Sequence, residues 1–367
     1  MEEGRLKQEM ESLWKETFGD SPAYVSLVFD NYFTPARVEY HEEDGELVAA
    51  MLGVPYEFRN GLGQTIKGLY LCGLATCREW RRKGIMSTLI ESANRKAHEE
   101  GYDFTFLIPA DEGMRQYYLD RGYTDSFYKI SEHYVKGHVF DRKEVRIRLD
   151  RGVGNAELIG YLTGKQARET AEKSTFGMVH TQKDWEVVMQ EFRLSGGDII
   201  AGKENGDIKG VAFVEKDERE GLKIRQLIAD TKETAQEILA RIEGESRSNI
   251  LWIRDLEDVV KEGEKQLWSP FYAVSNSRNA EYEDMAYVEE PYGSWRNAWP
   301  LGMVRLLDVR GLLDKLGWTT AETGQYSDAE LQKLILRRPV GVGSQADALE
   351  RILELPELTL TASLLLE

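Results

Sequence analysis

Residues 69–101 read LYLCGLATCREWRRKGIMSTLIESANRKAHEEG. The first part, Leu69 to Thr76, is apolar enough for a buried strand. In the second part, Ile85 to Glu99, apolar residues recur at helical spacing, and Gly101 follows where a helix-ending glycine belongs. The stretch therefore predicts a strand, a short basic loop and a helix.

The junction between this strand and this helix predicts an anion-binding site. The first backbone N–H groups of a helix lack intrahelical partners, and the helix dipole adds positive potential there. Gly84 lets a ligand approach the backbone closely, and three cations precede it: Arg81, Arg82 and Lys83. The segment has neither the Gly-Lys-Ser/Thr of a nucleoside-triphosphate loop nor the G-x-G-x-x-G of a dinucleotide fold. The expected ligand is a pyrophosphate, and a solvated basic turn is the alternative.

The surrounding segments predict a mixed α/β layer with a strand–helix–strand crossover at its centre. In order, periodicity and turn residues predict helices at 6–18 and 22–32, a hairpin at 37–54, one long strand or a strand pair at 64–76, a buried strand at 103–109, a short helix at 111–121 and one or two closing strands at 123–135.

The rest of the chain repeats this order only in part. The patterns predict a helix at 185–192, a hairpin at 198–214, a strand at 223–229 and a helix at 233–242. From about residue 295 the character changes, with 301–309 as a strand or the start of a helix and short helices at 312–316, 331–336 and 348–355.

The composition bounds the class of protein. The 367 residues have a formal net charge of −17 and are 41% hydrophobic, which is typical of a globular protein with two or three domains. Because a nucleic-acid binder needs a basic stripe, the charge argues against one, whereas it allows a cationic partner. Residues 1–14 lack the apolar core of a signal peptide, and the longest apolar run, 47–54, is shorter than the roughly 20 residues of a membrane helix. We therefore expect a cytoplasmic protein with no membrane partner.

Cys72 and Cys77 are the only cysteines. Two cysteines cannot build a disulfide framework, which favours a reducing compartment. Since side chains alternate along a strand, residues five positions apart should point to opposite faces. We expect both to be packing residues, without a disulfide or a shared metal.

Residues 74–123 resemble the core of the GNAT N-acetyltransferase superfamily. Arg81 and Gly84 match the family's R/Q-x-x-G-x-G/A motif, which binds the pyrophosphate of coenzyme A, while Met86 stands at the second small residue. The resemblance implies acetyl-CoA as cosubstrate, no metal, and a strand N–H near Ala75 that polarises the acetyl carbonyl. It implies these cofactor-binding residues: Leu74, Ala75, Thr76, Arg81, Arg82, Lys83, Gly84, Ile85, Met86 and Ser87.

Residues 114–123, MRQYYLDRGY, resemble the family's F-Y-x-x-x-G-F/Y element. The tyrosine four residues before the glycine is the usual general acid, which here is Tyr118, and we interpret Tyr117 as a helix core residue. A phenol can protonate the departing thiolate, and a base must take a proton from the attacking amine. The base is open, because its candidates by residue type have no distinctive spacing: Glu39, His41, Glu43, Glu46 and His133.

The whole layout resembles the Eis-like (enhanced intracellular survival) group. The resemblance implies an active GNAT domain at 1–138, a degenerate second GNAT domain at 139–295 and a shortened sterol-carrier-protein-like C-terminal α/β domain at 296–367. In that group the terminal carboxylate serves as base, which would be Glu367 here. The second domain lacks the glycine loop, so we expect it to bind no coenzyme A. The group often assembles, so a homo-oligomer is open.

The sequence thus predicts an acetyl-CoA-dependent N-acetyltransferase that acetylates a primary amine of a small cationic molecule or of a lysine in a peptide. The alternative is a catalytically inactive coenzyme A-binding regulatory or scaffold protein, suggested by the departures from the family pattern at Arg78 and Met86 and by the short C-terminal region. A lipid carrier is a third and weaker hypothesis, because the C-terminal region is short for an apolar cavity.

Overall fold

The computed structural model describes residues 1–140, 146–172, 176–217, 221–255, 288–290, 294–319, 321–336 and 360–361. The helices are α1 (Glu3–Phe18), α2 (Pro22–Tyr32), α3 (Ile85–Glu99), α4 (Glu112–Leu119), α5 (Asn155–Glu172), α6 (Gln182–Leu194), α7 (Lys232–Ser246), α9 (Val309–Leu316) and α10 (Asp328–Ile335), with short 3-10 turns η1 (Pro35–Arg37), η2 (Arg78–Trp80) and η4 (Ala321–Gln325). The strands are β1 (Val38–Glu43), β2 (Glu46–Arg59), β3 (Thr65–Thr76), β4 (Phe104–Leu107), β5 (Thr124–Tyr134), β6 (Arg148–Asp150), β7 (Phe176–Val179), β8 (Asp198–Glu204), β9 (Asp207–Asp217), β10 (Gly221–Ala229), β11 (Ile250–Asp255), β12 (Val288–Glu290), β13 (Ser294–Leu306) and β14 (Leu360–Thr361).

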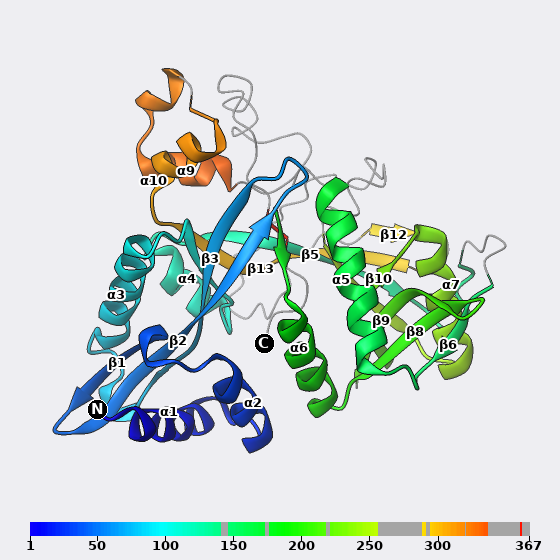
Figure 1. The fold of residues 1–367 in the computed structure, drawn as a ribbon, viewed down its shortest axis with the longest axis horizontal. Helices are drawn as coiled ribbons and strands as arrows, with labels where there is room; N and C mark the ends of the chain where they lie inside the picture. Colours follow the sequence, from blue (N-terminus) through cyan, green and yellow to red (C-terminus); the bar gives the residue numbers. More distant parts are fainter. Residues whose placement is uncertain are drawn as a thin grey trace.

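One mixed sheet runs through the described residues (Figure 1). Its order is β14-β7-β2-β3-β4-β13-β5-β11-β10-β9-β8-β6, with β1 paired to β2 and β12 to β13. β2 pairs antiparallel with β3, whereas β3 and β4 are parallel and are joined by α3. The predicted mixed sheet with flanking helices is confirmed, and the 64–76 segment is one long strand.

Two hydrophobic layers cover the two faces of this sheet in the first part of the chain. One layer packs α1, α2, α9 and α10 against β2 and β3, and it includes Trp14, which meets Phe29 edge-on at 5.7 Å. The other packs α3 and α4 on the opposite face, around Ile90 and Tyr118. Side chains that alternate along the strands therefore feed two separate cores.

The helix boundaries follow the local signals in the sequence. Ser21 caps α2 by accepting a hydrogen bond from the Tyr24 amide, and Asp111 caps α4 by accepting one from the Met114 amide. Gly19 ends α1 in the left-handed conformation, with φ 73°. Because β3 and β4 are parallel, the residues that follow them lie at the same edge of the sheet.

β13 inserts a late segment of the chain into the first sheet. It pairs antiparallel with β4, from Met303 opposite Leu107, and with β5, from Ser294 opposite Tyr134. The sequence patterns predicted a strand or a helix start only at 301–309, so the strand begins earlier than expected. The helices that follow it, α9 and α10, agree with the predicted ones, whereas the one expected at 348–355 lies outside the described residues.

The second part of the chain repeats the element order of the first. The hairpin β8–β9 is followed by β10, α7 and β11, and β10 pairs parallel with β11 as β3 pairs with β4. β11 pairs with β5, which joins the two halves edge to edge. The division into domains at 1–138, 139–295 and 296–367 stays a prediction, and β13 crosses the second of these boundaries.

Both cysteines are free thiols, and they lie on one face of the sheet rather than on two. The expectation of opposite faces was wrong because β3 contains a bulge between the pairs Ala50–Ala75 and Leu52–Cys72. A bulge shifts the alternation of side chains by one residue. Cys72 and Cys77 therefore both contact the core that contains α1 and α2.

The fold should lose stability in alkali. Burial raises the pKa of the Tyr123 hydroxyl to about 12 and that of the Cys72 thiol to about 12. Between the ordinary pKa values and these, the unfolded chain loses protons that the folded chain keeps. The free energy of unfolding should therefore fall by about 1.4 kcal/mol per pH unit and group as the pH rises from about 9 or 10 towards 12.

Urea unfolding at pH 8 and pH 11 measures this decline. Cys72→Ala removes one of the groups and should make the decline shallower. An equal urea midpoint at both pH values would contradict the account.

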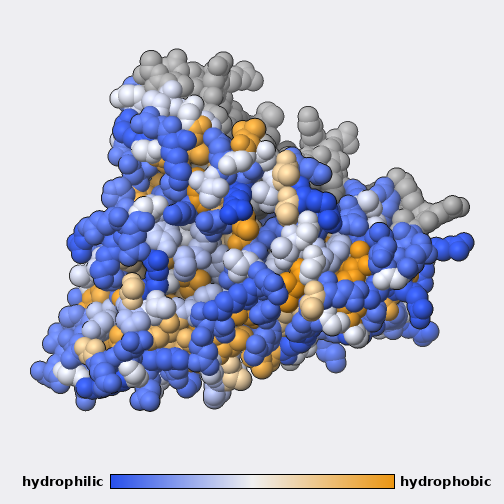
Figure 2. All heavy atoms as spheres, viewed as in Figure 1, coloured by the Kyte–Doolittle hydropathy of each residue, from blue (hydrophilic) through white to orange (hydrophobic). Residues whose placement is uncertain are grey.

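Hydrophilic residues cover most of the face shown in Figure 2, and hydrophobic side chains reach it in scattered groups. Within the described residues, no helix combines the length and the apolar content that crossing a membrane requires.

Candidate active site

The central feature of the site is the separation of β3 from β4. The parallel register runs from Gly68 opposite Phe104 to Tyr70 opposite Phe106. β3 continues to Thr76, and among the described residues 71–76 have no strand partner on that side. Two neighbouring parallel strands that stop pairing leave backbone groups of the longer one available to a ligand.

Backbone alternation decides which amides face this gap. The Cys77 amide donates to the Val48 carbonyl at 2.8 Å, so it points towards β2. In an antiparallel pair every second residue does so, which turns the Ala75 amide towards β2 as well. The amides of Leu74 and Thr76 therefore face the gap. The strand N–H that the family resemblance predicts near Ala75 would therefore be the amide of Leu74 or of Thr76.

The glycine loop leaves the start of α3 open. Residues 81–84 are exposed, and Gly84 occupies the N-cap position with φ 80°. No side chain caps α3, and its first turn holds no acidic residue. A Cβ built on Gly84 would meet nothing within 4 Å, so the space in front of the loop is free.

The three cations of the loop have different surroundings. Arg81 donates from Nε to the Thr76 carbonyl at 2.9 Å, which ties the loop to the end of β3. The Lys83 ammonium lies 3.9 Å from the centre of the Trp80 ring. Arg82 has φ 62°, which turns the chain into the glycine. The predicted basic residues thus directly precede Gly84 and the first turn of α3.

The corresponding helix of the second part lacks this opening. Thr231 caps α7, and its side chain accepts a hydrogen bond from the Thr234 amide. One of the free amides of α7 is therefore already satisfied within the chain, whereas those of α3 have no side-chain partner. The expectation that the second part binds no coenzyme A stays a prediction.

Tyr118 lies on α4 with its ring in the core beneath β3. The residue is 5% exposed, and its ring contacts those of Tyr117 and Tyr123 edge-on. Among the described residues its hydroxyl has no hydrogen-bond partner. Burial raises the pKa of Tyr118 well above the usual value, so the phenol stays protonated at physiological pH. A neutral, unpaired hydroxyl is what a proton donor needs.

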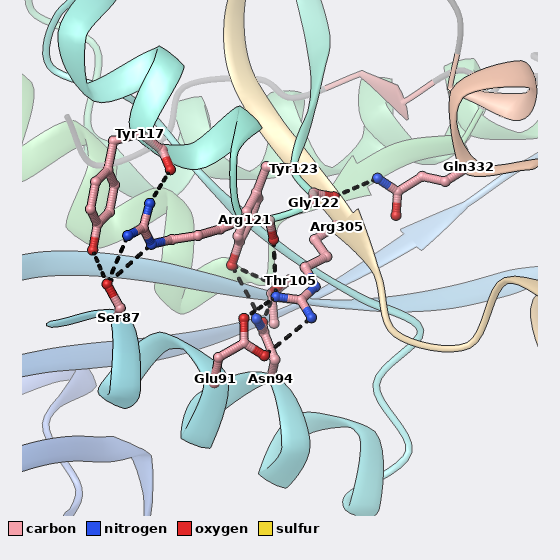
Figure 3. A network of polar contacts seen from close by, with 10 residues as sticks. All are labelled: Ser87, Glu91, Asn94, Thr105, Tyr117, Arg121, Gly122, Tyr123, Arg305 and Gln332. Atoms are coloured by element: carbon pink, nitrogen blue, oxygen red, sulfur yellow. Dashed lines mark hydrogen bonds and ion pairs between the residues drawn. The ribbon is translucent and has the colours of Figure 1, made fainter. Parts of the chain in front are cut away.

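Tyr117 packs against the core of α3 and α4, as its interpretation as a helix core residue predicts, but its hydroxyl reaches α3. The side chain is half-buried, and its hydroxyl lies 2.9 Å from Ser87 Oγ in the first turn of α3 (Figure 3). Arg121, which sequence reasoning missed, donates to the same Ser87 Oγ. The only sequence signal for it was a cation next to Gly122 at the end of a tyrosine-containing helix.

The candidate bases do not converge on the gap. β1, which carries Glu39, His41 and Glu43, lies on the far side of β2 from β3, two strand spacings or about 10 Å away from the gap. Glu39 pairs with a lysine of α3, and His41 Nε2 lies 3.0 Å from Glu43 Oε1. Glu46 is exposed, and His133 is buried beside Ser131 on β5. Glu367 lies outside the described residues.

The residues present fit a diphosphate. Unpaired amides, nearby cations and an open approach at Gly84 are the donor set that binds phosphate at helix N-termini. The residues described contain no cluster of three or more histidine, cysteine or acidic side chains suited to a metal ion.

Comparisons with known proteins agree with this geometry. Residues 5–125 match the acetyltransferase (GNAT) domain family. No curated protein matches the chain. The matched segment spans the two N-terminal helices and the β3–α3–β4–α4 unit, so this part of the chain is similar to a GNAT acetyltransferase domain, and the protein is an acyltransferase.

Three solved structures share the fold. A probable N-acyltransferase from Enterococcus faecalis is 14% identical, with a TM-score of 0.62 over 84% of this chain and 72% of that one. Eis1 from Mycobacterium abscessus is 12% identical, with a TM-score of 0.61 over 86% and 74%. A GCN5-related N-acetyltransferase from Anabaena variabilis is 13% identical, with a TM-score of 0.58 over 82% and 70%. At these identities the likeness concerns the fold alone.

Proposed function

We propose that the protein is an acetyl-CoA-dependent N-acetyltransferase that acetylates a primary amine of a small cationic molecule or of a lysine. The observation that carries the proposal is the gap that opens where β3 continues beyond its pairing with β4, shortly before the uncapped first turn of α3. Bound acetyl-CoA would supply the thioester. The amides of Ile85, Met86 and Ser87 would hold the diphosphate, with Arg81, Arg82 and Lys83 adding positive charge.

Met86 is compatible with this role, because the contact that the second small residue of the motif makes is a backbone contact. The Met86 side chain packs at the edge of the core of α3 and α4. Its amide therefore stays in the first turn, where no side chain caps it.

The remaining chemistry falls to two groups of the chain. The Leu74 amide faces the gap and would donate to the carbonyl oxygen of the acetyl group, where negative charge develops as the amine attacks. When the C–S bond breaks, the Tyr118 hydroxyl would give its proton to the sulfur. The amine must be neutral to attack, and lysine-like amines have a pKa near 10.4, so a base or a water chain must accept its proton. Glu367 remains our proposal for that base.

The charge of the protein supports a cationic acceptor. A net charge of −17 attracts amines from solution and raises their local concentration near the surface. We propose that the second part of the chain binds no coenzyme A and instead packs beside the first to shape the acceptor side.

An acetylation assay tests the proposed function. The protein is incubated with acetyl-CoA and a panel of polyamines, aminoglycosides and lysine peptides, and release of free thiol is followed. We expect amine-dependent thiol release together with coenzyme A binding in calorimetry. Binding without thiol release for any amine would favour the inactive coenzyme A-binding alternative, and the absence of both would contradict the proposal.

A further inference from the structure

Arg121 lies where α4 ends and reaches the first turn of α3 (Figure 3). Its Nε and Nη2 atoms donate to Ser87 Oγ at 3.2 and 2.9 Å, and Nη1 donates to the Tyr117 carbonyl at 2.6 Å. The guanidinium also stacks on the Tyr117 ring, with the Cζ atom 3.4 Å from the ring centre. These contacts hold the guanidinium rigidly beside the open amides.

The positive charge of Arg121 has no carboxylate partner among the described residues. The acidic residue one turn further along α3, Glu91, is engaged by both Nη atoms of Arg305. A guanidinium has five N–H donors, of which the three contacts above use three. Two N–H groups and a full charge thus remain for an anion.

The hydrogen bonds at Ser87 determine which proton the Tyr117 hydroxyl can donate. Ser87 Oγ accepts two hydrogen bonds from Arg121, so its own proton is directed to the Tyr117 hydroxyl at 2.9 Å. The Tyr117 oxygen accepts this hydrogen bond, so the proton of the Tyr117 hydroxyl is available to a ligand. Donors from the ends of α3 and α4 therefore meet at one place.

A segment more than 180 residues away in the sequence fixes this arrangement. Arg305 on β13 donates to the Arg121 carbonyl at 3.0 Å. Gln332 on α10 donates to the Gly122 carbonyl at 2.7 Å and to Thr124 Oγ1 at 2.9 Å, and its Oε1 accepts from the Leu306 amide. The backbone that carries Arg121 is thus held from the C-terminal side of the described chain.

We propose that Arg121 and Tyr117 bind a phosphoryl oxygen of coenzyme A beside the first turn of α3, and that Gln332 is a positioning residue for them. The proposal rests on the proposed function, because it concerns the same ligand. Arginine suits this role since its planar fork donates two parallel hydrogen bonds to a phosphate. The pantetheine arm separates the diphosphate of coenzyme A from the thioester, so these residues should act on binding and not on the chemical step.

Calorimetric titration of coenzyme A into Arg121→Met tests the proposal. We expect the Kd to rise about 10- to 100-fold, the loss typical of a hydrogen bond to a charged group. The KM for acetyl-CoA should rise similarly while kcat stays near that of the wild type. Arg95→Met is the matched control. Arg95 is an exposed cation on α3, far from the first turn of that helix, so this variant should bind coenzyme A with the wild-type Kd.

Three further variants keep the test decisive if Arg121→Met folds poorly. Arg121→Lys keeps the charge but loses the fork and should weaken binding less than methionine does. Tyr117→Phe removes only the hydroxyl and should raise the Kd several-fold with kcat unchanged. Gln332→Leu should raise the Kd less than Arg121→Met does, and should add little to it in the double variant.

The outcomes separate this proposal from the proposed function. If the wild type binds coenzyme A and the folded Arg121 and Tyr117 variants bind it equally well, the phosphate contact is wrong while the acetyltransferase assignment stands. If the wild type binds no coenzyme A, both fall.

Discussion

Replacement of Tyr118 by phenylalanine should lower kcat about 100-fold, within the usual range for removal of a general acid. The KM for acetyl-CoA should stay near the wild-type value, because the proposed role of the phenol is at the thioester and not at the phosphates. The hydroxyl has no partner among the described residues, so its removal should leave stability almost unchanged. Thiol-release kinetics and a thermal unfolding curve for the same variant measure both effects.

The raised pKa of Tyr118 adds a pH dependence to this prediction. Because burial keeps the phenol protonated, wild-type kcat should not decline through loss of this proton up to about pH 10, the usual pKa of tyrosine. Tyr102→Phe is the matched control: Tyr102 is a partly buried tyrosine beyond the other end of α3, stacked with Arg37. If Tyr118→Phe were as active as Tyr102→Phe, the Tyr118 hydroxyl would not be the general acid.

Gly73→Ala should destabilise the protein by about 3 kcal/mol and abolish the geometry of the gap. Gly73 has φ 61° in the bulge of β3, and an added Cβ would lie 2.0 Å from the Trp14 ring. The left-handed backbone accounts for about 1–2 kcal/mol and the overpacking for a further 1–3 kcal/mol. The bulge turns the Leu74 amide into the gap, so activity should fall together with the free energy of unfolding measured in urea.

Gly101→Ala separates the two costs of the Gly73 substitution. Gly101 has φ 79°, yet a Cβ there would meet nothing within 4 Å. Gly101→Ala should therefore lower the free energy of unfolding by about 1 kcal/mol and leave activity intact. Equal losses of stability from Gly73→Ala and Gly101→Ala would show that the contact with Trp14 does not restrict the residue at position 73.

Much of the site could be predicted because its signals are local. The basic loop, Gly84 and the apolar face of the helix fix α3 at Ile85–Glu99, which agrees with the prediction. The hairpin turn at 42–45 and the cap at Asp111 are likewise encoded by a few adjacent residues. Short-range backbone chemistry is what single-sequence patterns report.

The remaining features depend on residues far apart in the chain. No local pattern of Ser294–Leu306 indicates that it lies between β4 and β5, because any apolar strand could pair there. The bulge at Gly73 reverses the side-chain phase within β3, which moved Cys77 to the unexpected face. The contacts of Arg305 and Gln332 with the turn after α4 became visible only once the fold had joined them.

A crystal structure with acetyl-CoA bound tests the central claim most directly. The account predicts the diphosphate on the amides of residues 85–87, the acetyl carbonyl within hydrogen-bond distance of the Leu74 amide, and the Tyr118 hydroxyl facing the sulfur. Acetyl-CoA bound elsewhere, or a Tyr118 hydroxyl directed away from the sulfur, would contradict it.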